Sequence, residues 1–532
     1  MREIFEKKPI LKYIFLAVGA FLTALTLMIP AIGFLEWVSL VPAAVIFILT
    51  ATDTTVRYKK MYLYGFVYYM SFGLSIFHWF TKLYPLEFVG LNKLEAVAVV
   101  VAGWVGLSLL QAIFAAFMPV LMALILRKGV ASKHKMTIPF VSAALFTVFE
   151  WLQSLTWAGV PWGRLSIGQT GMPIMIKSAS VFGSYFITFL IVAVNFFIAL
   201  FLLMKRDEKK NVCIASATGL IALNFLVGGA AMLFEEKDGE KFKAAAIQVN
   251  ISSHEKWDMT SLDRTMNVIE EYGLKAADER ATLIVLPETA FPYHPLDNRE
   301  IYDFMTDLAV RCNATIVVGG FVRGEALDEN SLIFINPDGS IEESVYSKRH
   351  LVPFGEYVPL RKLITTIIPP LAEISMLSED LAPGEDSNVV DTAAGKLGGL
   401  ICFDSIYETI ALDSVRDGAE IIVLGTNDSW FLDSAAVYMH NAQAKLRAVE
   451  TGRYIVRSAN TGISSIITPN GEALDEEPPL VGGYAIADVA ARDSATVYSV
   501  IGNLWVYILI AGLALMLTRC FYEIRCDRRK NR

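Results

Sequence analysis

Cysteine and histidine are scarce in this chain: its 532 residues include only five cysteines and six histidines. No CxxC pair and no HExxH sequence occurs, so neither a disulfide framework nor a zinc site is indicated. The chain also lacks a P-loop and the GxSxG motif of serine hydrolases. We therefore expect neither a metal ion nor another cofactor.

Charged residues are few as well, at 19%, whereas hydrophobic residues reach 54% and the mean hydropathy is +0.47. Such a composition is too apolar for an ordinary soluble protein. The net charge of −8 argues against nucleic acid as a partner. Apolar runs fill the first third of the chain, while residues 235–497 have the composition of a soluble domain. The sequence therefore predicts a membrane part and a globular part.

Eight apolar runs are long enough to cross a membrane as helices. They cover residues 11–29, 36–52, 61–80, 95–126, 137–155, 180–204, 213–234 and 498–520. We expect residues 1–234 to form a membrane domain with seven transmembrane helices and 235–497 to form the globular domain. Residues 498–532 should then form the eighth transmembrane helix and a basic tail. In the fourth run we expect a kink at Pro119.

Lysine and arginine are concentrated in every second connection between these runs, as the positive-inside rule requires of cytoplasmic segments. The basic residues are Arg2, Lys7, Lys8, Arg57, Lys59, Lys60, Arg127, Lys128, Lys133, Lys135, Lys205, Arg206, Lys209, Lys210, Arg519, Arg525, Arg528, Arg529 and Lys530. This pattern predicts a multi-pass protein with both termini in the cytoplasm and the globular domain outside it.

One ionisable residue, Glu150, lies near the end of the fifth run, before the stretch WAGVPWGRLSIGQ (157–169). An aromatic belt at the membrane interface, with Gly and Pro turns, is one interpretation. The wall of a lipid-facing cleft is the other, because ionisable residues within membranes tend to be functional. The sequence leaves both open.

Short apolar runs and amphipathic segments alternate through the globular part. Strands are expected at 242–250, 282–288, 314–320, 396–403, 420–428 and 453–460, helices at about 262–279, 299–312 and 438–452, and hairpins at 331–348 and 464–474. This alternation predicts an α/β domain with one mixed sheet or two sheets flanked by helices.

Several predicted strands end in polar residues, namely Glu288, Cys402 and the pair Asn427 and Asp428, and Lys348 follows a hairpin strand. Such strand ends commonly line the site of a layered α/β fold. Each residue alone has an ordinary interpretation: Glu288 as a helix N-cap, Lys348 as a solvated loop charge, and Cys402 as a core thiol. Together, a carboxylate base, a lysine and a thiol are sufficient for acyl transfer.

The motifs around these residues resemble those of the nitrilase (carbon–nitrogen hydrolase) superfamily, which uses a Glu-Lys-Cys triad on an αββα sandwich. They are LPETAFP (286–292), YSKRHLVPFGEYVP (346–359) and GGLICFDSIYE (398–408). With its membrane spans, nearly the whole chain resembles the apolipoprotein N-acyltransferase family. Further matching segments are GVPW (159–162), KWD (256–258), NS (330–331), LVPFGEYVP (351–359) and NDSWF (427–431).

The resemblance implies a role for each residue of the triad. Glu288 would be the general base, Lys348 would stabilise the oxyanion, and Cys402 would be the nucleophile that becomes a thioester. Glu356 matches a second glutamate that supports the triad.

The resemblance also implies substrate-binding or supporting residues. Trp257 and Trp430 match aromatic residues near the site. The family commonly has Tyr-Glu after the cysteine, where this chain has Phe403 and Asp404. We expect this difference to affect how the acceptor or the acyl chain is held.

The implied reaction transfers an acyl chain from a membrane phospholipid, through the cysteine thioester, to the N-terminal amine of diacylglyceryl-cysteine apolipoproteins. This is the last step of lipoprotein maturation in the bacterial cell (inner) membrane, and we expect a monomer. The alternatives are a membrane-tethered nitrilase-type amidase and an acyltransferase with a different amine acceptor. A transporter with a large extracytoplasmic binding domain is the alternative without catalysis.

An apolar segment, LRKLITTIIPPLAEISML (360–377), lies between Lys348 and Cys402. It is either an ordinary core insertion or a membrane-contacting lid over the acyl site. We favour the lid, because exposed apolar segments are typical of lipid contact.

Overall fold

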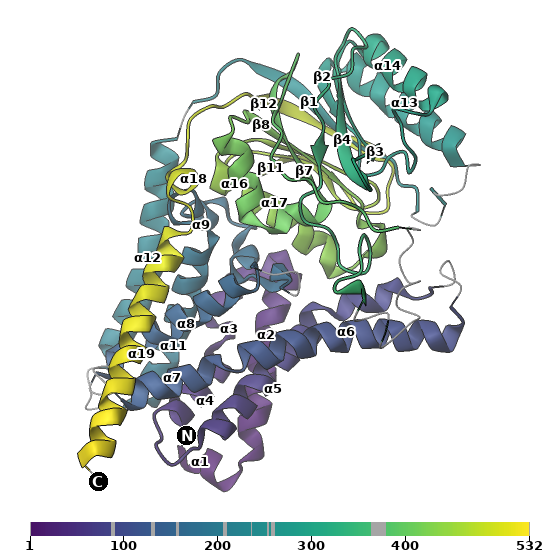
Figure 1. Cartoon of the computed structure of the whole chain (residues 1–532). Coiled ribbons are helices and arrows are strands. Elements are labelled where there is room, and N and C mark those ends of the chain that lie inside the picture. The colour runs from purple at the N-terminus through teal and green to yellow at the C-terminus, as the bar shows by residue number, and fades with distance from the viewer. Residues whose placement is uncertain are drawn as a thin grey trace. The chain divides into compact units, whose positions relative to one another are not determined.

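The computed structural model describes residues 2–86, 91–128, 134–155, 159–205, 210–235, 237–252, 255–256, 261–362, 366 and 379–530 (Figure 1). The chain divides into two compact units. Unit 1 comprises Met1–Thr81, Val99–Leu233 and Ile501–Arg532, and unit 2 comprises Lys82–Ala98 and Phe234–Val500.

Unit 1 is built from helices. The longer ones are α2 (Ile10–Met28), α4 (Val41–Ala51), α5 (Tyr58–Ile76), α6 (Lys93–Ala115, which begins in unit 2), α7 (Met118–Arg127), α8 (Ile138–Leu152), α11 (Ser184–Leu203), α12 (Asn211–Leu233) and α19 (Leu504–Lys530). Residues 95–126 form two helices instead of one, and Pro119 lies at the start of the second. Proline is tolerated there because the first turn of a helix needs no backbone N–H.

Among the described residues, seven helical segments are long and apolar enough to cross a membrane. They are Ile10–Met28, Pro30–Ala51, Lys93–Arg127, Lys135–Leu152, Ser184–Leu203, Asn211–Leu233 and Leu504–Asp527. Helix α5, at the position of the expected third span, is not one of them. Its sequence, YKKMYLYGFVYYMSFGLSI, has tyrosines and two lysines that lower its hydropathy.

Unit 2 contains two six-stranded mixed sheets. The first has the order β12 (Gly483–Ala490), β1 (Lys241–Gln248), β2 (Ala281–Val285), β3 (Thr315–Arg323), β4 (Asp328–Ile335) and β5 (Tyr346–Ser347). The second has the order β11 (Ala473–Glu477), β10 (Ser464–Ile467), β9 (Ile455–Ala459), β8 (Ile421–Thr426), β7 (Gly395–Ile401) and β6 (Val390–Thr392). In each sheet three strands are parallel, β1–β2–β3 and β7–β8–β9, and the outer pairings are antiparallel.

The side chains of β1 and β2 alternate between two hydrophobic cores. Ala244, Ala246 and Leu283 pack with residues of the second sheet, while Ile247 and Ile284 pack beneath α13 (Leu262–Asp278) and α14 (Arg299–Cys312). Helices α16 (Glu408–Arg416) and α17 (Ala435–Thr451) contact the strands of the second sheet (Figure 1). The result is the four-layer αββα sandwich implied by the resemblance, and the expected fold class is confirmed.

Candidate active site

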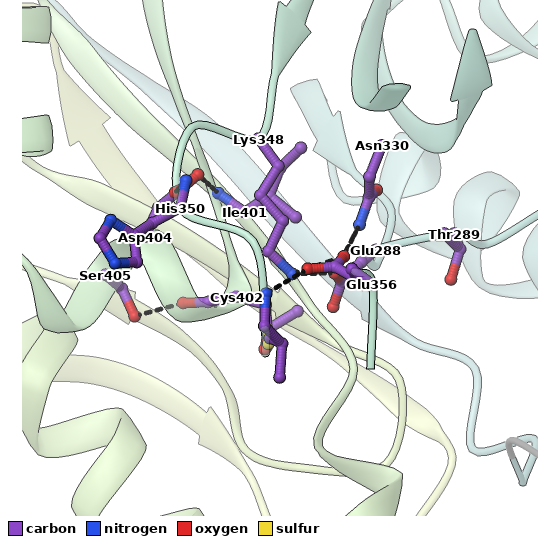
Figure 2. Close-up of polar contacts among 12 residues, drawn as sticks. Glu288, Thr289, Asn330, Lys348, His350, Glu356, Ile401, Cys402, Asp404 and Ser405 are labelled. Carbon is purple, nitrogen blue, oxygen red and sulfur yellow. Dashed lines mark hydrogen bonds and ion pairs between the residues drawn. The ribbon is translucent and has the colours of Figure 1, made fainter. Parts of the chain in front are cut away.

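Three polar residues that the sequence singled out lie at the ends of strands in unit 2 (Figure 2). Glu288 follows β2, Lys348 directly follows β5, and Cys402 directly follows β7. Strands β2 and β5 belong to the first sheet and β7 belongs to the second. The charges of Glu288 and Lys348 both act on the Cys402 thiol, so the two sheets together bring the three residues into one site.

Lys348 forms two short ion pairs at the centre of this site. Its Nζ lies 2.9 Å from Oε1 of Glu288 and 2.9 Å from Oε1 of Glu356. The Lys348 side chain is only 2% exposed, so both pairs are shielded from water. An ammonium group has three hydrogens, and these bonds use two of them. Among the described residues, Lys348 Nζ makes no third hydrogen bond.

Asn330 on β4 links the same two carboxylates. Its Nδ2 donates to Oε1 of Glu288 at 2.8 Å and to Oε1 of Glu356 at 2.9 Å. Oε2 of Glu356 accepts a hydrogen bond from the backbone N–H of Val352 at 2.8 Å. Glu356 therefore bonds both Lys348 and Asn330, as Glu288 does, and is itself fixed by its own loop.

The two central charges stabilise each other. Burial on its own would lower the pKa of Lys348, but the charges of Glu288 and Glu356 raise it well above its usual value. Burial would likewise raise the pKa of Glu288, but the positive charge of Lys348 lowers it overall. Lys348 is thus an ammonium and Glu288 a carboxylate in the resting protein, ready to accept a proton.

Cys402 is held in an unusual backbone conformation. Its φ is +47°, in the left-handed region that non-glycine residues seldom adopt. Burial, followed by the charge of Glu288, raises the pKa of its thiol. Cys402 therefore rests as a thiol.

Asp404 faces the protein interior. Oδ2 accepts hydrogen bonds from the Tyr346 hydroxyl at 2.8 Å and the Ile401 N–H at 3.1 Å, while Oδ1 accepts from the His350 N–H at 2.8 Å. Burial raises its pKa to about 6, although Lys348 and these donors act against the shift. The carboxylate ties the loop that contains Lys348 to the turn that contains Cys402.

The aromatic residues expected near the site are described in part. Phe403 packs edge-on against Tyr407, with ring centroids 5.5 Å apart. Trp430 is half-buried in the short helix η11 (Asp428–Trp430). Trp257 lies outside the described residues, as do residues 363–365 and 367–378 of the expected lid.

Lys256 is a buried residue that sequence reasoning did not single out. Its Nζ donates to the carbonyl oxygen of Thr289 at 3.0 Å and also bonds the Thr289 hydroxyl, directly after Glu288. Burial lowers its pKa to about 8, while the charges of Glu288 and Cys402 oppose this shift. The KWD motif was a signal for this position, but its interpretation centred on Trp257.

In unit 1, Glu150 is bonded within the protein. Its Oε1 accepts from the Thr188 hydroxyl at 2.6 Å and its Oε2 from the Leu165 N–H at 3.0 Å. Arg164 belongs to the stretch WAGVPWGRLSIGQ (157–169) and is fully buried. It donates to the side chains of Ser184 and Tyr185 at 2.9 Å each. These polar groups tie α8, α11 and the stretch between them together.

Sequence comparison identifies the class of the globular part. The Carbon-nitrogen hydrolase family model matches residues 243–498, which include both sheets except for the first two residues of β1. Unit 2 is therefore an enzyme domain of the carbon–nitrogen hydrolase class, in a membrane protein. The solved structure of Saccharomyces cerevisiae Nit3, a member of branch 10 of the nitrilase superfamily, is 22% identical, with a TM-score of 0.37, over 48% of this chain and 93% of that one.

The remaining matches narrow the class to one family. The model of the Apolipoprotein N-acyltransferase N-terminal domain matches residues 19–197. An apolipoprotein N-acyltransferase of Geobacter metallireducens is 29% identical over 527 residues, 97% of this chain and 96% of the relative. One from Coxiella burnetii is 30% identical over 372 residues, 69% of this chain and 73% of the relative. The chain belongs to the apolipoprotein N-acyltransferase family.

Proposed function

We propose that this enzyme transfers an acyl chain from a membrane phospholipid to the N-terminal amine of diacylglyceryl-cysteine apolipoproteins, through a thioester on Cys402. The observation that carries the proposal is the match along 97% of the chain to a relative named apolipoprotein N-acyltransferase. The Glu-Lys-Cys site alone would serve a hydrolase equally well, so the substrates come from this full-length likeness.

In the first half-reaction Glu288 accepts the thiol proton while Cys402 Sγ attacks the ester carbonyl of the phospholipid. The remaining N–H of Lys348 and a backbone N–H donate to the oxyanion that forms. When the ester C–O bond breaks, Glu288 returns the proton to the departing oxygen. A lysophospholipid leaves, and the acyl chain remains on Cys402 as a thioester.

In the second half-reaction the free α-amine of the acceptor attacks the thioester. Glu288 accepts a proton from the amine as the new C–N bond forms, and the same oxyanion contacts are used again. The C–S bond then breaks, Cys402 recovers its proton from Glu288, and the N-acylated lipoprotein leaves. No redox partner or cofactor takes part in either step.

The arrangement in the membrane supports this use of two lipid substrates. We propose that residues 1–234 form the membrane domain, that 235–497 form an extracytoplasmic catalytic domain, and that 498–532 return the C-terminus to the cytoplasm of the cell (inner) membrane. The alternation of basic connections supports this orientation, which requires α5 to cross the membrane together with the six more apolar segments that precede residue 235. We further propose that the protein acts as a monomer.

The thioester is tested by incubating the purified full-length protein in detergent with a phospholipid that is radiolabelled in its acyl chain. We expect label on the protein that hydroxylamine removes. Cys402→Ala should abolish it, whereas Cys312→Ala, the same change at the buried cysteine of α14, should retain it. Label that persists in Cys402→Ala, or no label with any of several headgroups, contradicts the proposal.

A further inference from the structure

His440, on α17, lies buried behind the nucleophile and is 1% exposed. Its Nδ1 lies 2.7 Å from Oδ1 of Asp428, whose Oδ2 accepts from Nη2 of Arg457 at 2.7 Å. Both partners are fully buried. Burial opposes ionisation of Asp428, but His440 and Arg457 hold its pKa below the usual range, so it is a carboxylate that can only accept.

The other ring nitrogen of His440 faces the turn that contains the nucleophile. Nε2 lies 3.0 Å from Oγ of Ser405 and 3.1 Å from the carbonyl oxygen of Cys402. Ser405 Oγ donates its single hydrogen to that same carbonyl at 2.7 Å (Figure 2). Both groups near Nε2 are then acceptors, so Nε2 must carry a hydrogen, as Nδ1 does toward Asp428.

We propose that His440 is a doubly protonated imidazolium that positions Cys402 through its carbonyl group and stabilises the Cys402 thiolate as it forms. An Nδ1–H bond to Asp428 and an Nε2–H bond to Cys402 account for the contacts with Asp428, Ser405 and Cys402. Nη2 of Arg457 lies 3.4 Å from Nδ1 and donates its closer bond, at 2.7 Å, to Asp428. The inference rests on the proposed role of Cys402 as nucleophile, and it adds a positioning residue outside the Glu-Lys-Cys set.

Electrostatics supports the second part of this role. The Cys402 sulfur, a nitrogen of His440 and a carboxylate oxygen of Asp428 all lie within 4.8 Å of one another. The charged groups that face His440 are Asp428 from η11 and Arg457 from β9, while Ser405 and Cys402 face it from the turn after β7. Asp428 raises the pKa of the Cys402 thiol, and a positive charge on His440 beside the sulfur opposes that effect and favours the thiolate.

The test measures the ionisation of Cys402 without any acyl substrate. Iodoacetamide alkylates the full-length protein in detergent over a range of pH, and mass spectrometry of the Cys402 peptide gives the rate. His440→Gln retains a hydrogen-bond donor but not the charge, so we expect its midpoint to lie about one pH unit higher, with alkylation about tenfold slower below the midpoint. Ser405→Ala is the matched control, and it should shift the midpoint of alkylation by only a few tenths of a pH unit.

An unchanged midpoint in folded His440→Gln overturns the proposal, because a neutral imidazole that accepts from Ser405 would leave the thiol unaffected. A second measurement covers the case in which the variant does not fold. In wild-type protein with ¹⁵N-labelled histidine, we expect the nitrogen signals of one of the six histidines to show a hydrogen on both ring nitrogens. Absence of such a signal also overturns the proposal. Neither measurement uses a lipid substrate. Each can therefore fail or succeed whether or not the proposed acyl transfer takes place.

Discussion

At the residue scale, the proposed mechanism requires Glu288 to accept the thiol proton of Cys402 before the sulfur attacks. Glu288→Gln keeps the size of the side chain and its contact with Lys348 but cannot accept that proton. We expect acyl-enzyme formation to be about 10²–10⁴-fold slower, as is typical when a general base is lost. Single-turnover labelling measures this rate, with the exposed Glu271→Gln as control. A Glu288→Gln protein that is labelled at the wild-type rate would exclude Glu288 as the base.

Lys256 gives a second prediction at this scale. Burial lowers the pKa of Lys256 from 10.5 to about 8. At a pH between these two values, Lys256 is more fully protonated in the unfolded chain than in the folded protein. The stability contributed by this residue therefore rises with pH in this window. We expect the difference in Tm between wild type and Lys256→Met to grow in favour of wild type from pH 8 to pH 10. The exposed Lys275→Met should show no such growth, and a flat difference for Lys256→Met would contradict the assignment.

At the scale of elements, Asp404 joins the loop after β5 to the turn after β7. Asp404→Asn replaces one carboxylate oxygen with an NH2 group. That group faces at least one of the three hydrogen-bond donors that bond the carboxylate, so a buried hydrogen bond is lost and two donors point at each other. We expect a loss of about 2–3 kcal/mol in unfolding free energy. Tyr346→Phe removes one donor only and should cost about 1 kcal/mol. Denaturant titration compares the two, and equal stability of Asp404→Asn and wild type would contradict this linking role.

The elements of unit 2 could be predicted because their hydrophobic periodicity is simple. The buried strand before Cys402 and the helix that became α13 are examples. The contacts between Asp428 and His440 could not be predicted in this way. They join the end of a strand to a helix, whereas the periodicity indicates only that residues 438–452 form a helix. Helix α5 was expected as a span from its length, whereas its tyrosines and lysines make it less apolar than the other long helices.

The candidate site could be predicted to a similar extent. The strand ends and the motifs singled out Glu288, Lys348, Cys402 and Glu356, and the structure brings these four residues together. Asp404 was expected to be a supporting or substrate-binding residue, and in the structure it accepts hydrogen bonds from the Tyr346 hydroxyl and from the His350 and Ile401 N–H groups. The sequence identifies Asp404 but not where its side chain points, because its partners Tyr346 and His350 lie more than fifty positions away in the chain.

At the scale of the whole molecule, the charge pattern predicts which side of the membrane each segment occupies. A reporter that is active only outside the cytoplasm should work when it is inserted after the exposed Ala326, between β3 and β4, and should fail at the C-terminus. A reporter that is active only in the cytoplasm should give the opposite result at both sites. Cytoplasmic activity at Ala326 would overturn the proposed orientation.

The central claim is that the acyl chain passes to an amine, and one measurement tests it most directly. The full-length enzyme is incubated with phospholipid and a diacylglyceryl-cysteine lipopeptide, and the peptide is analysed by mass spectrometry. We predict a peptide heavier by one acyl chain, attached at the α-amine, and no change in a matched peptide whose amine is already acetylated. Free fatty acid together with an unmodified peptide would contradict the account and indicate a hydrolase.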